Sequence, residues 1–89
     1  MAVVRTISVD NGIYHGSIWK EVFTFAAADT EFECAHNIEG GRMLMVVELT
    51  TGQPLWPTFD YTVSHDGSKT LTLNEPLGFA GTLLITNME

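Results

Sequence analysis

The chain of 89 residues is poor in basic residues: four Lys or Arg stand against eleven Asp or Glu, so the formal net charge is −7. The bases Arg5, Lys20, Arg42 and Lys69 are scattered along the sequence and form no basic stripe. Binding to nucleic acid needs such a stripe to neutralise phosphates, and anionic membrane surfaces attract basic segments in the same way. We therefore expect neither nucleic acid nor a membrane among the partners.

Long apolar runs are also missing. Runs such as Met43 to Val47 are far shorter than the roughly 18 residues that span a bilayer. The first residues, Met1 to Arg5, are not followed by the apolar core of a secretory signal, so we expect synthesis in the cytoplasm. Cys34 is the single cysteine and cannot form an internal disulfide.

Motifs of catalysis and metal binding are absent from the sequence. The histidines His15, His36 and His65 are isolated, whereas zinc sites normally contain a close pair of ligands. Cys34 and His36 have no oxyanion motif or third orienting group beside them, so Cys34 is interpreted as a buried small hydrophobe. Glu31 and Glu33 fit a solvated strand face. We expect no enzymatic activity, no metal and no cofactor.

Helical periodicity is nearly missing, while a period of two recurs throughout. This pattern predicts an all-β fold, a compact antiparallel β-sandwich or barrel of about seven short strands. Arg42 to Leu49 is almost continuously apolar and fits a central strand, and Asp66-Gly67 is a strong hairpin signal. The other clear strand segments are Val22–Phe25, Phe32–Ala35, Phe59–Val63, Thr70–Leu73 and Thr82–Thr86.

The first 19 residues have a different pattern from residues 20–89, which are expected to form a single β-sandwich domain. Val3 to Val9 fits a strand that Asp10-Asn11-Gly12 would break. Residues 1–19 are interpreted either as an arm or exchanged strand, or as an ordinary N-terminal hairpin that turns at Asn11-Gly12.

Two segments are candidate partner contacts. The first comprises Ile13, Tyr14, Ile18 and Trp19; the second comprises Pro54, Leu55, Trp56 and Pro57. The prolines of the second segment cannot donate ladder hydrogen bonds, which predicts an edge or crossing connection, with Trp56 as a plug. Burial within their own domain is the alternative for both segments.

The order of elements from Phe32 to Ile85 resembles small β-sandwich modules in the structural proteins of tailed-phage virions. The matching features are His36-Asn37, Met43 to Leu49, Thr51-Gly52 before Pro54, the hairpin at Asp66-Gly67, Thr70 to Leu73, Pro76, and Gly81 to Ile85. They cover about the last two thirds of the chain.

This resemblance implies a virion component on the capsid surface, a decoration or cement protein that binds and stabilises the lattice of the major capsid protein. It implies a homo-oligomer, with a trimer as the guess from lattice symmetry. One alternative is a tail or fibre module that binds a receptor or glycan through Trp56, Tyr61 and nearby acids. Another is a small inhibitor of a basic protein, acting through charge complementarity.

Overall fold

The protein is described by a computed structural model that covers residues 3–12, 17–36, 38 and 44–88. All regular structure in these residues is β. The strands are β1 (Val4–Gly12), β2 (Ser17–Phe25), β3 (Glu31–Glu33), β4 (Met45–Glu48), β5 (Gln53–Leu55), β6 (Tyr61–Val63), β7 (Thr70–Leu73) and β8 (Gly81–Met88). The described residues contain no helix long and apolar enough to cross a membrane.

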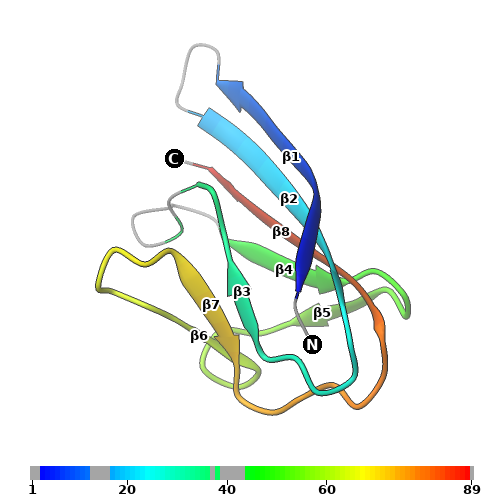
Figure 1. The fold of residues 1–89 in the computed structure, drawn as a ribbon. Helices are drawn as coiled ribbons and strands as arrows, with labels where there is room; N and C mark the ends of the chain where they lie inside the picture. Colours follow the sequence, from blue (N-terminus) through cyan, green and yellow to red (C-terminus); the bar gives the residue numbers. More distant parts are fainter. Residues whose placement is uncertain (1–2, 13–16, 37, 39–43, 89) are drawn as a thin grey trace.

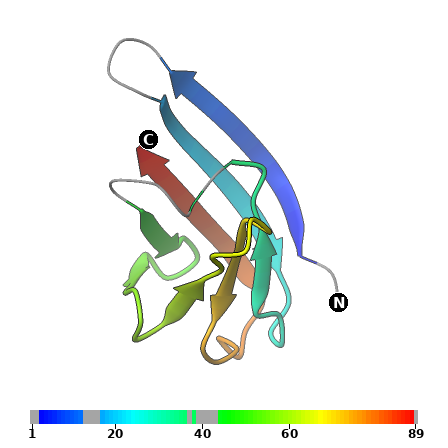
Figure 2. The same cartoon turned by 90° about the vertical axis from the view of Figure 1, so that its left-hand side faces the viewer.

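The strands form two antiparallel sheets. One sheet has five strands in the order β1-β2-β8-β4-β5, and the other has three in the order β3-β7-β6. Figures 1 and 2 show the small sheet facing the large one, with the β1–β2 ladder extending beyond it. The predicted all-β sandwich is confirmed, and the described residues form eight strands where the sequence indicated about seven.

The core lies between the two sheets and is rich in aromatic side chains. Phe32 of β3 meets Phe23 and Phe25 of β2 edge to face, with ring centroids 5.6 and 5.9 Å apart. Leu71 on β7 and Leu83 on β8 are fully buried beside them. Alternation along each strand thus sends one set of side chains inward, as the period of two predicted.

The β1–β2 hairpin differs from the predicted turn. β1 continues through Asp10 to Gly12, and Asn11 and Gly12 are still paired with Ile18 and Ser17. The prediction of a break or turn at Asn11-Gly12 is therefore wrong, because a continuous ladder with β2 outweighs the local turn preference of these residues. One extra residue of β1 forms a bulge between Arg5 and Ile7.

Several local predictions are confirmed and two are wrong. β4 lies between β8 and β5, as expected of a central strand, and β6 and β7 form the hairpin around Asp66-Gly67. Trp56 is not a plug: it is 61% exposed, because Leu55 faces the core and alternation directs the next side chain outward. Phe59 is not in a strand either, since β6 begins at Tyr61.

Candidate functional site

The structure separates the predicted contact residues. Trp19 is buried in the core, at 1% exposure, and the backbone of Ile18 pairs with Met88 within β2. Ile13 and Tyr14 lie outside the described residues. In the second segment Leu55 is buried, whereas Pro54, Trp56 and Pro57 are exposed. Of the first segment, the structure therefore describes no exposed side chain.

The exposed part of the second segment belongs to a compact loop, residues 56–60, which we call the aromatic loop. Trp56 is 61% exposed and Phe59 is 85% exposed, so two large aromatic side chains face solvent within four residues. Sequence analysis missed Phe59 because it was assigned to the alternating strand. Pro57 and Asp60, both typical turn residues, were the signal that a loop lies here.

Asp60 closes the aromatic loop on itself. Its carboxylate accepts a hydrogen bond from the backbone N–H of Trp56 at 2.7 Å, and its own N–H donates to the Trp56 carbonyl at 2.8 Å. The N–H of Thr58 donates to the carbonyl of Tyr61 at 2.9 Å. Three hydrogen bonds across the six residues 56–61 hold the backbone in one conformation.

Asn74, which follows β7, also stabilises the aromatic loop through hydrogen bonds. Its side-chain amide donates to the carbonyls of Thr58 and Phe59 at 2.8 and 3.0 Å, and its backbone N–H donates to the Asp60 carbonyl. Thr58 has a φ of 74°, a left-handed conformation that is costly for a β-branched residue. Such strain persists where the surroundings over-determine it, and it is concentrated at functional sites.

Two shallow depressions flank the aromatic loop. One is lined by Leu55, Phe59, Asp60 and Leu73 together with residues 74–77. The other is lined by Pro57, Thr58, Tyr61, Thr62, Val63 and His65. The aromatic loop therefore contributes Phe59 and Asp60 to one depression and Pro57 and Thr58 to the other.

A second polar cluster lies inside the sandwich around Glu21, which is fully buried. Its carboxylate accepts hydrogen bonds from the backbone N–H groups of Ala35 and His36 at 3.0 Å, and the His36 Nδ1 is 2.7 Å away. Arg5 approaches to 3.5 Å, and the His36 ring stacks on Trp19. Glu21 shares the inward face of β2 with Trp19 and Phe23, so period-two alternation could have revealed it. This cluster joins the end of β3 to β2.

Cys34 lies beside this cluster and is buried, as predicted. Burial and, next, the negative charge of Glu21 raise the pKa of the Cys34 thiol to about 12. We expect the native protein to react with a thiol reagent such as DTNB at pH 8 far more slowly than the protein unfolded in guanidinium chloride, because the thiolate is the reactive form. Equal rates in the two states would contradict this prediction.

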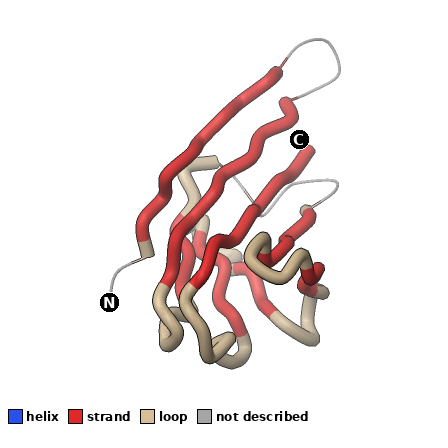
Figure 3. The backbone as a smooth tube through the Cα atoms, turned by 90° about the vertical axis from the view of Figure 1, so that its right-hand side faces the viewer, coloured by secondary structure: helices blue, strands red, loops and turns tan. Residues whose placement is uncertain are grey.

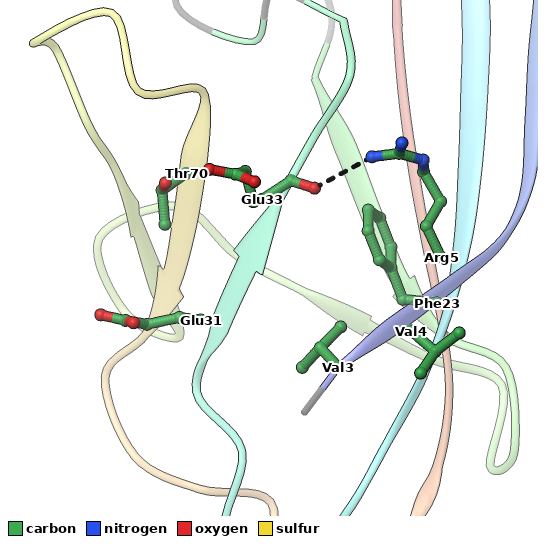
Figure 4. Close-up of a pocket in the computed structure, with 7 residues that line it drawn as sticks. All are labelled: Val3, Val4, Arg5, Phe23, Glu31, Glu33 and Thr70. Atoms are coloured by element: carbon green, nitrogen blue, oxygen red, sulfur yellow. Dashed lines mark hydrogen bonds between the residues drawn. The ribbon is translucent and has the colours of Figure 1, made fainter. Parts of the chain in front are cut away.

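A cleft at the open side of the sandwich, between β1 and β3, is lined by Val3, Val4, Arg5, Phe23, Glu31, Glu33 and Thr70. Arg5 donates to the backbone carbonyl of Glu33 across it at 3.3 Å (Figure 4). The carboxylates of Glu31 and Glu33 lie on the far side of β3 from Arg5 (Figure 4). Neither carboxylate therefore meets the guanidinium group of Arg5 in the cleft. The hydrogen bond of Arg5 thus connects β1 to β3 across the cleft.

Within the described part of the chain, no group of three or more His, Cys, Asp or Glu residues could hold a metal ion. Comparisons with protein-family models, curated protein sequences and solved structures found no match. The two sheets form a small antiparallel β-sandwich. Its candidate functional site is the aromatic loop, where Trp56 and Phe59 are exposed.

Proposed function

We propose that the protein is a non-enzymatic structural component that attaches to a larger protein assembly through the aromatic loop. The observation that carries this proposal is the exposure of Trp56 and Phe59 on a backbone fixed by Asp60 and Asn74. Aromatic side chains dominate the binding energy of protein interfaces, and a rigid backbone lowers the entropy lost on binding.

The resemblance to virion modules makes a phage capsid the first assembly to test. In this proposal the protein decorates the lattice of the major capsid protein on the capsid surface, and the aromatic loop inserts into that lattice. Many copies on one lattice tolerate a small interface for each subunit, which suits a chain of 89 residues. Its acidic character keeps free subunits from aggregating before assembly.

Quantitative mass spectrometry of virions from the source of the sequence tests the location. A copy number equal to that of the shell subunit, or a simple fraction of it, supports decoration. A few copies per particle would indicate a tail module instead, and absence from the particle would overturn the virion proposal.

Two loop variants test the attachment site. We expect Trp56→Ala and Phe59→Ala to weaken binding to undecorated capsids at least tenfold each, because truncating an aromatic anchor costs about 2 kcal/mol or more. Their thermal unfolding should change little, since both side chains are exposed. Phe79→Ala is the matched control, as Phe79 is an exposed aromatic residue in the connection between β7 and β8. Full binding by both loop variants would show that the aromatic loop is not the anchor.

A tail module that binds a receptor or glycan is the second candidate function. Trp56 offers a face for stacking, and Asn74, Glu75 and Asp60 line the neighbouring depression as hydrogen-bonding groups. Tyr61, expected to belong to this surface, is 2% exposed and contributes no aromatic face. A glycan array read with the wild type and Trp56→Ala tests this function: signals that disappear in the variant support it, and a blank array contradicts glycan binding.

A further inference from the structure

The outer face of the five-stranded sheet, turned away from the core, is aliphatic. Val22, Leu84, Val47 and Pro54 are paired in register across β2, β8, β4 and β5, so their side chains form one row. Val4 and Met45, 54% and 52% exposed, lie on the same face in adjoining rows. We call these six residues the aliphatic face. In Figure 3, which looks toward this side, β1, β2 and β8 run in front of the rest of the sandwich.

The two outer faces of the sandwich differ in chemistry. The small sheet presents two carboxylates and three hydroxyls, those of Glu31, Glu33, Thr62, Thr70 and Thr72. The aliphatic face is bordered by Thr24, Thr82 and Thr86, and Lys20 is the one charged side chain that the structure describes there. A long lysine side chain can keep its ammonium group in water while its stem covers apolar surface.

Each described carboxylate lies elsewhere. Glu21 and Glu48 are buried between the sheets, and Asp10 of β1 is paired with Trp19, a core residue, rather than with a residue of the aliphatic face. The other acidic residues that the structure describes lie on β3 or in turns: Asp29, Glu31, Glu33, Asp60, Asp66 and Glu75. In a chain with eleven acidic residues, this leaves one whole sheet face without a described negative charge. Two copies of a chain with a net charge of −7 repel each other, so a contact between them has to avoid carboxylates.

We infer that the aliphatic face is covered by the same face of a second copy of this chain, in a two-fold dimer. A face that meets itself about a two-fold axis is complementary in composition by construction. Two β-sheets can pack face to face about 10 Å apart with their strands inclined by about 30°. A basic partner would instead be attracted to the acidic small sheet.

The area of the aliphatic face limits the affinity expected for the dimer. Four strands about 4.8 Å apart and about five residues long give a patch of roughly 300 Å². Stable complexes bury about 800 Å² per partner. The dimer is therefore weak, and its population depends on protein concentration and salt. Salt screens the net charge of the two copies and therefore strengthens the dimer, whereas added salt would weaken a contact driven by charge complementarity.

Sedimentation velocity over a range of protein concentrations, at low salt and at about 0.5 M salt, tests the inference. We expect a monomer–dimer equilibrium that shifts toward dimer in salt. Val47→Lys should raise the dimer dissociation constant at least tenfold, and Met45→Lys, at a more exposed position, gives a second reading in case Val47→Lys does not fold. Thr72→Lys adds the same charge to the opposite face and should dimerise at least as well as the wild type.

Three results would overturn the inference: a wild type that is monomeric at all concentrations and salts, dimerisation unchanged by the folded Val47→Lys or Met45→Lys variant, or dimerisation lost equally in Thr72→Lys. A dimer that depends on Trp56 but not on Met45 or Val47 would assign self-association to the aromatic loop. The experiment uses the isolated chain, so its outcome is independent of the capsid-binding tests.

Discussion

Replacing Glu21 with alanine is expected to lower the free energy of unfolding by about 3 kcal/mol. The carboxylate is the acceptor for the backbone N–H groups of Ala35 and His36 and for the His36 ring, and Arg5 lies 3.5 Å away. The substitution removes all these contacts at once and leaves a cavity beside Trp19. Arg5 and His36 retain partial access to water, which keeps the loss below that of a fully enclosed ion pair.

Urea denaturation followed by tryptophan fluorescence measures the effect. A domain of this size has a total stability of about 4–13 kcal/mol, so the variant should be unfolded at a much lower urea concentration. Glu33→Ala removes an exposed glutamate from β3 and should cost no more than about 0.5 kcal/mol. A Glu21→Ala midpoint equal to that of Glu33→Ala would contradict the role assigned to the buried carboxylate.

Gly81→Ala is expected to destabilise the protein by a similar amount, about 3 kcal/mol, for a steric reason. A Cβ at this position would lie 2.5 Å from the Thr50 Oγ1, 2.9 Å from the Glu48 Oε2 and 3.2 Å from the Phe25 Cζ. None of these atoms can move freely. The Thr50 hydroxyl accepts from the Thr82 N–H at 3.1 Å, and Glu48 is held by the turn that follows β4.

That turn depends on a buried charge. The Glu48 carboxylate accepts hydrogen bonds from the N–H of Thr50 at 2.9 Å and from the N–H and hydroxyl of Thr51 at 2.7 and 2.8 Å. Burial opposes the charge, but these donors outweigh it and hold the pKa of Glu48 below its ordinary value. At neutral pH the group near a new Cβ is therefore an ionised carboxylate with all its donors in place.

A double-mutant cycle isolates the steric cause. Thr50→Ala removes the nearest atom, so the combined variant Gly81→Ala/Thr50→Ala should be more stable than the sum of the single losses predicts, by about 1 kcal/mol. Urea denaturation of the four proteins gives this coupling. Strict additivity would mean that the crowding at Gly81 is relieved in some other way.

Much of the fold could be predicted from the sequence because the residues of most strands show the alternating pattern that a strand requires. The alternation in Thr70 to Leu73 gives the buried and partly buried pattern of β7, and Asp66-Gly67 gives the hairpin before it. The apolar run before Leu49 indicated the central position of β4. These are local signals, since a strand's period and a turn's φ angles depend on nearby residues.

The candidate site was predicted only in part, because its parts come from distant segments. Trp56 was singled out, but Asn74, which holds the aromatic loop, lies 16 residues after Thr58. Trp19 was a candidate either for a partner contact or for burial in its own domain, and the structure buries it. Whether an aromatic side chain is exposed depends on which strands pack beside it in the folded protein. Neither local propensity nor the spacing of residues in the sequence contains that information.

By itself, then, the sequence determined the β class, the positions of most strands, the acidic charge and the shortage of basic residues. Only the tertiary structure decided that Glu21 lies among aromatic side chains, that Gly81 leaves room for Thr50, and that carboxylates and aliphatic side chains separate onto opposite outer faces. The physical reason is the pairing order of the strands. Side-chain period is local, but the sheet to which a strand belongs, and the neighbours of its outer face, are set by contacts between residues far apart in the chain.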